Sequence, residues 1–593
     1  MIYMARNDFG YAFNYDNIGN LISIKIADRV LVNNTYRKTN DLDEDNESVY
    51  VNSSITYGNG TKYEYVYDTN NENIVSIKIN NVLSYEMIYD ENGNMIEQKD
   101  HVNNINYTYE YDDEGNIIKF NSSDGFLINS SSEKAVSETD TVENGKIVYS
   151  QNEEKRESIY SLHTTDEEVS ETSTLISGDK VNIKTNGSNK KEIYVTNDKE
   201  EDILSVVVNK NDDNTATISN NGVIKKYTYD KYNNISAISN NGELLTSYKY
   251  DNLEQLTREN DVTSGKTITY KYDKGGNIIS KKIYDYSDSD ITSEAVETID
   301  YEYKDSTWKD MLTKYDNQEI TYDEIGNPLK YRDDMNFTWE NGRCLSTVTN
   351  NNTKIKYSYN KDGVRVSKNV DGIITKYYLK DYDIISEETN GNIIWYLYNS
   401  SGNLLGFENN GNAYYYEKNL QNDIIGILDN TGKNLVSYYY DALGNITKID
   451  GDSKLAKINP FRYRGYYYDE ETGLYYLNSR YYDSKTGRFI NADDPNMAII
   501  SAITNNNGNL YSYCNNNPVK NMDTTGYWIT VDSLILNSIS AITNWLKLRN
   551  PIITGARLLR AVSNYMYNKK NGKKYINSGK KYMVRNQIKL LKN

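Results

Sequence analysis

The sequence predicts an all-β protein that consists of one long run of antiparallel hairpins. Two observations support this prediction. First, the 593 residues include 59 Tyr but only 8 Phe, 5 Trp and 5 Pro. Tyrosine fits the pleated surface of a strand, and its hydroxyl needs water or a polar partner, so an excess of Tyr favours sheet that is half wet on both faces. Second, one short motif recurs along the chain at nearly constant spacing.

The recurring motif reads Tyr-x-Tyr-Asp-x-x-Gly-Asn followed by Ile or Leu. The Tyr that precedes Asp falls at Tyr67, Tyr89, Tyr111, Tyr229, Tyr250 and Tyr272, with degenerate copies at Tyr15, Tyr322, Tyr359 and Tyr440. The two Tyr of a motif alternate and therefore share one face of a strand. Asp is expected to cap a turn, Gly and Asn to tolerate positive φ, and Ile or Leu to begin the return strand. A step of about 22 residues thus predicts one hairpin plus a connection.

A run of hairpins this long is expected to curl or close on itself, because open twisted sheets of more than about ten strands are uncommon. Between residues 120 and 225 the motif fades into sequence rich in Ser, Glu, Asp and Asn. Alternating apolar residues persist there in KIVYSQ, KEIYVTN and ILSVVVN. This segment is therefore expected to hold degenerate hairpins with long polar turns rather than a linker.

Few residues are available for metal or acid–base chemistry. The Asp-Gly-Asn turns lack the full acidic spacing of a calcium loop, which favours plain turns. The two Cys, Cys344 and Cys514, are too few for a disulfide framework, and the two His, His101 and His163, disfavour a His-based centre. We therefore expect no cofactor and no metal. An apolar run of about 18 residues and a leader at MIYMARNDFG are both lacking, so no membrane segment or signal peptide is expected.

The charge of the chain reverses at Tyr527. After it stand 13 Lys/Arg and a single acid, Asp532, so this part carries +12. The remainder holds 53 basic and 83 acidic side chains and carries −30. Two parts of opposite charge attract, and their association should weaken with salt. The sequence thus predicts a boundary at this point.

The repeats resemble the Tyr–Asp (YD) repeats of Rhs proteins, wall-associated bacterial toxins, teneurins and the C components of insecticidal toxin complexes. Residues 459–495, NPFRYRGYYYDEETGLYYLNSRYYDSKTGRFINADDP, resemble the Rhs repeat-associated core signature almost residue for residue. The resemblance covers about residues 10–527, weakly from 120 to 225. It implies a spiral of repeats that forms a hollow shell, closed at one end by the core segment, with a C-terminal polypeptide held inside.

The resemblance further implies three segments: a YD-repeat shell over residues 1–458, a core or plug over residues 459–527, and a variable C-terminal region over residues 528–593. In the family that last region is usually a toxin, which implies an immunity protein as partner and a secreted or cell-surface location. Because the chain begins almost directly on a repeat, a fragment without N-terminal delivery domains is one alternative. A shell with a wet interior would also explain the preference for Tyr over Phe.

The resemblance assigns chemistry to the junction NMDTTGYW. In the family, two Asp near the end of the core are implicated in cutting the chain just after a D-P-x-G-hydrophobic motif. Carried over by position, the first is Asp494, with its neighbour Asp493 as the alternative, and the second is Asp523. The cut would then fall between Tyr527 and Trp528.

Two close carboxylates in a shielded site share a proton, so one activates water while the other protonates the carbonyl or the leaving amine. Gly526 would let the backbone bend close to them, and Pro495 and Pro518 would support the flanking turns. The motifs read DPNM and DTTG, so the second has Thr524 in place of Pro. At most, then, the chain is a self-cleaving aspartyl protease. The alternative is that both Asp only cap turns.

The tail is predicted to be small, helical and basic. Apolar residues stand at helical spacing over residues 528–550, and Pro551 ends this segment. A second helix-like segment, ARLLRAVSNYMY, follows. Three roles remain open: binding of nucleic-acid phosphates, action on a membrane, and a non-catalytic remnant. The tail contains neither His nor Glu, which leaves almost no residues for acid–base or metal chemistry.

Together these features favour a toxin-delivery shell for competition between bacteria, which encloses a C-terminal effector and releases it by self-cleavage after Tyr527. The alternative is a cell-surface adhesion protein whose Tyr rings stack on glycans. An ordinary metabolic enzyme is disfavoured, because the sequence has no Gly-rich phosphate loop, no Ser/His/Asp set and no metal motif.

Overall fold

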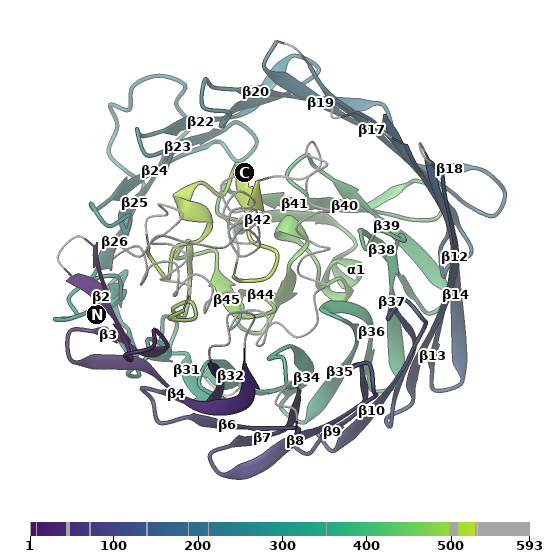
Figure 1. The fold of residues 1–593 in the computed structure, drawn as a ribbon. Helices are drawn as coiled ribbons and strands as arrows, with labels where there is room; N and C mark the ends of the chain where they lie inside the picture. Colours follow the sequence, from purple (N-terminus) through teal and green to yellow (C-terminus); the bar gives the residue numbers. More distant parts are fainter. Residues whose placement is uncertain are drawn as a thin grey trace.

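The computed structural model describes residues 2–531, except residues 7–8, 43–47, 70–72, 138–139, 166, 188, 212, 351–352, 497–507 and 528–529. Almost all of this part is strand or turn. The strands wind into a ring around an interior that holds further strands (Figure 1). The predicted all-β architecture, a curled run of antiparallel hairpins that forms a hollow shell, is confirmed.

Within the described residues, the first sheet contains strands β1 to β28, each paired antiparallel with the next. Its strands are β1 Ile2–Arg6, β2 Phe9–Tyr15, β3 Leu21–Ile26, β4 Arg29–Leu42, β5 Ser48–Tyr57, β6 Lys62–Tyr67, β7 Ile74–Ile79, β8 Val82–Tyr89, β9 Met95–Asp100, β10 Ile105–Tyr111, β11 Ile117–Ser122, β12 Phe126–Val136, β13 Asp140–Gln151, β14 Glu154–Thr165, β15 Glu168–Thr174, β16 Lys180–Asn186, β17 Lys190–Thr196, β18 Asp202–Lys210, β19 Thr215–Asn220, β20 Val223–Tyr229, β21 Ile235–Asn240, β22 Glu243–Tyr250, β23 Leu256–Asp261, β24 Lys266–Tyr272, β25 Ile278–Asp285, β26 Glu297–Glu302, β27 Lys314–Tyr315 and β28 Gln318–Glu319.

The second sheet continues the same pattern from β29 to β42. Its strands are β29 Thr321–Tyr322, β30 Pro328–Lys330, β31 Asn336–Glu340, β32 Cys344–Asn350, β33 Thr353–Tyr359, β34 Arg365–Val370, β35 Ile373–Lys380, β36 Asp383–Thr389, β37 Asn392–Tyr398, β38 Leu404–Asn409, β39 Asn412–Lys418, β40 Ile424–Leu428, β41 Asn434–Tyr440 and β42 Ile446–Gly451.

Short elements follow the second sheet. They are helix α1 Ser453–Ile458, the 3-10 turn η1 Tyr463–Gly465, strands β43 Tyr467–Asp469, β44 Leu474–Leu477, β45 Arg480–Asp483 and β46 Arg488–Phe489, the turn η2 Cys514–Asn516, and strands β47 Asn521–Met522 and β48 Thr530–Val531. Strands β43 to β46 form a small antiparallel sheet. Figure 1 places β44 and β45 inside the ring.

The Asp of each repeat closes its turn with its own carboxylate. At Asp90, Oδ1 accepts hydrogen bonds from the backbone N–H of Asn92 (2.9 Å) and of Asn94 (2.8 Å), while Oδ2 accepts from the Asn94 side chain (3.0 Å). Gly93 has φ +77°. Equivalent bonds form at Asp16, Asp112, Asp230, Asp273, Asp323 and Asp441. The predicted turn chemistry therefore applies along the whole run.

The Tyr that precedes this Asp ties one hairpin to the previous strand. The Tyr89 hydroxyl donates to the Ile74 carbonyl (3.0 Å), and the Tyr250 hydroxyl donates to the Ile235 carbonyl (2.7 Å). The same bond forms at Tyr67, Tyr111, Tyr272 and Tyr440. It also forms at Tyr303, Tyr359 and Tyr398, which precede Lys304, Asn360 and Asn399 instead of Asp. The expectation of broadly wet Tyr faces therefore needs correction. Many hydroxyls are satisfied by backbone carbonyls. Tyr89 and Tyr250, for example, lie at β-bulges where the pairing register shifts.

The second sheet follows the first around the ring as a second layer. Polar contacts join the two layers at several places around the ring. They link Asn59 to Asp323, Asn103 to Tyr359, Gln151 to Ser386, Asn220 to Lys418 and Lys281 to Asp441. The partners come in the same order along both sheets. The chain is thus a two-layered spiral, and apolar side chains of both layers share one core.

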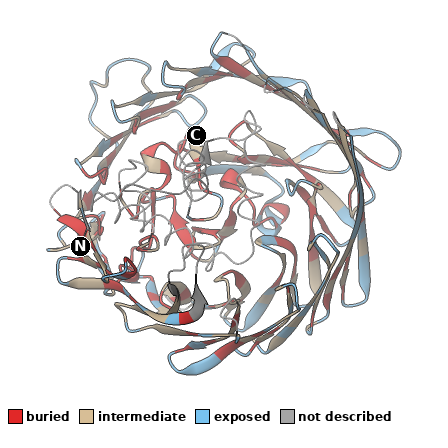
Figure 2. Ribbon diagram, in the orientation of Figure 1, coloured by how far each residue is buried: buried red, intermediate tan, exposed pale blue. Residues whose placement is uncertain are grey.

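Among the described residues, the two ends of the first sheet meet through side chains and form no strand pairing with each other. Apolar residues of β2 to β4 pack against Trp308, Met311 and Tyr511. Arg29 also pairs with Asp305 (3.1 Å). Figure 2 shows buried residues concentrated in the central elements and exposed ones at many turns of the outer wall.

The small sheet is anchored to the second layer by a buried ion pair. Arg365 on β34 lies 2.6 Å from Asp469, and neither side chain is exposed. The guanidinium also contacts the rings of Tyr357, Tyr377, Tyr467 and Tyr476. This pair holds β43 within the ring.

The predicted helix of residues 528–550 is not confirmed. Thr530 and Val531 form β48, which pairs with β47, so at these two residues the backbone is extended and hydrogen-bonded to Asn521 and Met522. Residues 532–593, with the rest of the predicted helices, lie outside the described residues.

Candidate processing site at the junction

Three segments of the core meet at the junction. Strand β45 carries Arg480, the segment after β46 carries Asp493 and Asp494, and the segment after β47 runs from Asp523 to Tyr527. The segment after β46 is held by the β-bridge between Arg488 and Ser512 and by the hydrogen bond from the N–H of Asp493 to the Leu510 carbonyl (2.8 Å).

Arg480 lies at the centre of this arrangement. Its Nη2 is 3.1 Å from Asp493 Oδ2 and 3.4 Å from Asp523 Oδ2. Nη1 donates to the Leu510 carbonyl (3.0 Å), and Nε donates to the Gly526 carbonyl. One guanidinium therefore binds two carboxylates and the backbone of the junction turn.

Asp493 is a buried carboxyl with an unusual proton affinity. Its Oδ1 accepts a hydrogen bond from the N–H of Asp494 (2.7 Å). Burial raises the pKa of Asp493 to about 7, and the nearby Asp523 adds to this rise, while Arg480 and Arg343 oppose it. Asp493 thus changes charge near neutral pH, which suits a group that must both take and give a proton.

Asp523 closes the junction turn as a repeat Asp closes its own. Its Oδ1 accepts from the N–H of Gly526 (2.8 Å) and of Thr525 (3.2 Å), and its own N–H donates to the Tyr466 hydroxyl (2.9 Å). Gly526 has φ +76°, and a Cβ there would lie 2.7 Å from the Leu477 carbonyl oxygen. The turn therefore requires glycine on two counts.

The other predicted residues lie near this centre. Asp494 accepts from the N–H of Asn496 (2.8 Å) and lines the interior cavity, as Tyr527 does. Pro495 and Pro518 are buried in flanking turns, and the Pro518 carbonyl accepts from Arg464. Trp528 lies outside the described residues.

The structure thus brings Asp493, the alternative, to Asp523 through Arg480, whereas Asp494 faces the cavity. Asp493 and Asp494 are neighbours with identical side chains, so their positions in the sequence alone did not show which of them meets Asp523. Arg480 and Tyr466 were missed as site residues. The sequence offered one clue, which was that both residues lie inside the core signature. Most Arg and Tyr of that signature pack in the interior, so the clue did not single these two out.

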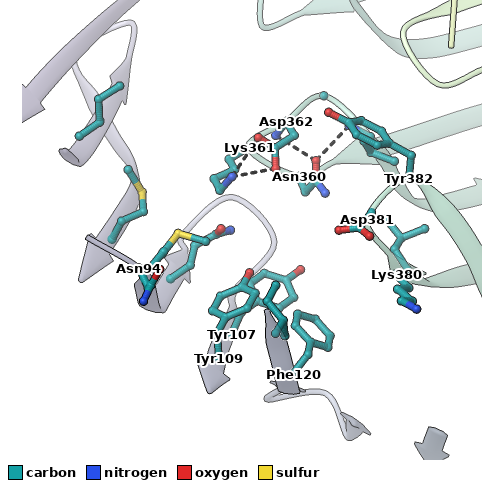
Figure 3. Close-up of a pocket in the computed structure, with 18 of the residues that line it drawn as sticks. Asn94, Tyr107, Tyr109, Phe120, Asn360, Lys361, Asp362, Lys380, Asp381 and Tyr382 are labelled. Atoms are coloured by element: carbon teal, nitrogen blue, oxygen red, sulfur yellow. Dashed lines mark hydrogen bonds and ion pairs between the residues drawn. The ribbon is translucent and has the colours of Figure 1, made fainter. Parts of the chain in front are cut away.

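The junction opens on a cavity of about 2820 Å³. Its lining among the described residues includes fifteen Tyr, twelve acidic and six basic side chains. Figure 3 shows Tyr107 and Tyr109 of β10 and Phe120 of β11 on one side, facing Asp362 and Tyr382 on turns of the second layer. Burial together with the nearby Asp494 and Asp493 raises the pKa of Tyr527, although 41% of its surface faces the cavity.

In the described part of the chain, no group of three or more His, Cys, Asp or Glu is arranged to hold a metal ion. Among the same residues, no helix has the length and apolar character needed to cross a membrane.

Comparison with known proteins places the chain in a family. A family model described as Teneurin YD-shell matches residues 240–519. The tRNA3(Ser)-specific nuclease WapA of Bacillus spizizenii is 31% identical over 346 residues, 53% of this chain. The chain is an Rhs/YD-repeat protein. The tRNA nuclease WapA of Bacillus subtilis strain 168 is similar to the same extent, with 32% identity over 345 residues.

The matched regions cover only 14% of the length of either WapA protein. A shorter match, 33% identical over 101 residues, joins this YD-repeat protein to the double-stranded DNA deaminase toxin A of Burkholderia cenocepacia strain H111, covering 17% of this chain and 6% of that protein. Among solved structures, the crystal structure of TcdB2-TccC3-TEV has a TM-score of 0.53 at 16% identity, covering 88% of this chain and 30% of the other. This last likeness concerns the fold of the YD-repeat shell.

Proposed function

We propose that this YD-repeat protein is the shell of a toxin system, which encloses its own C-terminal region and releases it by cutting between Tyr527 and Trp528. The observation that carries the proposal is the position of Tyr527: it faces the cavity directly after the turn held by Asp523 and Arg480. In this proposal residues 1–458 form the shell, residues 459–527 the core with the cleavage site, and residues 528–593 the effector region.

The proposed reaction is hydrolysis of one peptide bond. Asp493 takes a proton from water, and the water oxygen attacks the Tyr527 carbonyl carbon. The C–N bond to Trp528 then breaks, and Asp493 returns the proton to the leaving amine. Asp523 holds the turn in position through the Thr525 and Gly526 amides. The reaction needs neither cofactor nor metal.

Charge supports enclosure of the C-terminal region. That region carries 13 Lys/Arg and one acid. The described residues that line the cavity include twice as many acidic as basic side chains. Attraction in a confined space of this kind favours retention and weakens with salt. An effector that is toxic to its producer also requires an immunity protein, and the proposed use in competition between bacteria requires export to the cell surface or beyond.

The target of the effector region is a separate proposal. WapA relatives are named as tRNA nucleases, and the Lys- and Tyr-rich tail fits binding to phosphate backbones. The absence of His and Glu from residues 528–593 leaves few groups for nuclease chemistry. Membrane action and a non-catalytic remnant therefore stay as alternatives, which growth of cells expressing residues 528–593 alone would distinguish.

The adhesion alternative has less support. Stacking on glycans requires aromatic rings on the outer surface. Among the described residues, the Tyr side chains that are exposed are Tyr3, Tyr232 and Tyr527, and Tyr527 faces the cavity. Most of the described Tyr side chains of this shell pack against other residues or line the interior cavity.

The proposal predicts that the purified, denatured protein contains a fragment beginning at Trp528, as measured by intact mass spectrometry. Asp493→Asn and Asp523→Asn should each lower the rate of cleavage by about 100-fold or more, because the first removes the group that transfers the proton and the second removes the carboxylate that positions the turn. Asp494→Asn is the matched control and should cleave at nearly the wild-type rate.

A wild-type chain that stays full length at every pH would contradict the proposed self-cleavage. If Asp494→Asn abolished cleavage while Asp493→Asn did not, the carboxyl assignment given above would be wrong and the self-cleavage itself would stand.

A further inference from the structure

A lysine, an aspartate and a glutamate meet between the two layers of the shell. We infer that Lys281 and Asp441 form an isopeptide bond beside Glu259: the Lys281 amine condenses with the Asp441 carboxyl. The bond joins β25 of the first layer covalently to the turn between β41 and β42 of the second. All three residues precede Tyr527, so the bond is independent of the proposed cleavage and serves instead to fasten the wall.

The two reacting groups are close together and shielded from water. Lys281 Nζ lies 3.4 Å from Asp441 Oδ2, and the two side chains are 6% and 7% exposed. Glu259 is also buried, and its Oε2 accepts a hydrogen bond from the N–H of Ala442 (3.0 Å). Ala442 and Leu443, which follow Asp441, belong to the apolar core that the layers share. The fold thus holds an amine and two carboxyls together in a dry site.

Burial favours an amide over an ion pair at this place. Desolvation makes a buried charged pair costly, whereas an amide carries no charge. Burial and the Asp441 carboxylate raise the pKa of Glu259 well above its ordinary value; Asp261 adds to the rise, while the Ala442 N–H and Lys281 oppose it. Glu259 therefore keeps its proton to higher pH than an ordinary glutamate, which suits a proton donor for the condensation.

The reaction balances without a further reactant. Lys281 passes one proton to the Asp441 carboxylate and becomes a neutral amine, the nucleophilic form. Its Nζ attacks Asp441 Cγ, and Glu259 donates a proton to Oδ2, the oxygen next to Lys281. The Cγ–Oδ2 bond then breaks, one water leaves, and Glu259 regains a proton from the new amide nitrogen. Oδ1 remains and keeps its hydrogen bonds to the N–H groups of Leu443 and Asn445.

A second buried lysine–aspartate pair is the matched control within the same chain. Lys368 Nζ lies 3.1 Å from Asp469 Oδ1. Burial raises the pKa of Asp469, but the attraction of Arg365 and Lys368 outweighs burial and leaves this pKa below its ordinary value. A carboxylate that a guanidinium holds in its charged form is a poor acceptor for an amine. We therefore expect an ion pair and no covalent link at Asp469.

The test is mass spectrometry of the purified, denatured chain and of its tryptic peptides. The isopeptide makes the part of the chain that contains both residues lighter by one water molecule. Trypsin does not cut after an acylated lysine, so it should yield a branched peptide that joins Lys281 to Asp441. Lys281→Met should lack this peptide. Glu259→Gln keeps an acceptor for the Ala442 N–H and should form the link about 100-fold or more slowly, as followed in pulse-labelled chains.

The results distinguish the isopeptide from other products. A wild type of full calculated mass without the branched peptide overturns the inference, whether or not the chain is cut after Tyr527. Loss of one water without the branched peptide indicates a succinimide and also overturns it. A link between Lys368 and Asp469 would contradict the need for an uncharged carboxyl. Equally fast linkage in Glu259→Gln overturns the role of Glu259; if circular dichroism shows that this variant does not fold, the wild-type peptide still decides whether the bond exists.

Discussion

At the scale of single residues, carboxylates in this protein serve two different purposes. The repeat Asp, as at Asp90, bond to the backbone and to the Asn of their own turn. Asp493 instead faces a buried guanidinium and a second carboxyl from distant segments. The same side chain is a local turn cap in one place and a titrating group in the other, because burial and neighbouring charges differ.

The turn caps are expected to be individually modest. Asp90→Ala removes three hydrogen bonds from one turn and should weaken local protection by about 1–2 kcal/mol. The amides of Asn92 and Asn94 should then exchange roughly 5–30 times faster, as measured by hydrogen exchange with mass spectrometry.

Glu91→Ala provides the control in the same turn. The hydrogen bonds described for Asp90 and its partners do not involve the Glu91 side chain. Equal exchange in both variants would mean that backbone pairing alone holds the turn.

At the scale of elements, the small sheet depends on the second layer. Arg365 and Asp469 form a buried pair, and Lys368 approaches the same carboxylate (3.1 Å). The Arg365 and Lys368 cations hold the pKa of Asp469 below its ordinary value despite burial. Removing one partner of such a pair leaves a buried charge, which is more costly than replacing both partners.

Arg365→Met should therefore destabilise the protein by about 3–5 kcal/mol, seen as a lower midpoint of thermal unfolding. The double variant Arg365→Met with Asp469→Leu should recover much of this loss, because no carboxylate is then left without its arginine. A double variant less stable than the single one would show that the ion pair itself, rather than the buried charge, governs stability.

The repeat elements were predictable from sequence, and the reason is local. Each motif contains its strand, its turn cap and its glycine within about ten residues. The motif did not reveal the partner of each Tyr hydroxyl, such as the Ile74 carbonyl for Tyr89, because that carbonyl belongs to the preceding hairpin and a bulge sets the register.

At the scale of the whole molecule, buried carboxyls between the layers make stability depend on pH. Glu259 of β23 accepts from the N–H of Ala442 in the second layer (3.0 Å). Burial, together with the nearby Asp441 carboxylate, raises the pKa of Glu259 well above its ordinary value. The folded state thus binds this proton more tightly than the unfolded state. Its contribution to stability is complete below about pH 4.3 and is lost as pH rises toward the folded-state pKa.

Glu259→Gln should therefore flatten the fall in the midpoint of thermal unfolding as pH rises from about 5 to 9. Glu319→Gln, on the exposed part of β28, should leave that pH dependence unchanged. The same slope in both variants would locate the pH dependence elsewhere, with Asp493 as the next group to replace.

The sequence by itself determined the hairpins, their turn chemistry, the charge reversal at Tyr527 and the region of the junction. Each of these depends on neighbours within one repeat or on composition, so it can be read along the chain. The tertiary structure decided that the layers stack with Asn59 at Asp323 and Lys281 at Asp441. It also decided that Asp493, and not Asp494, meets Asp523 through Arg480. These pairings join segments far apart in sequence, and burial and charge act only once folding has brought such segments together.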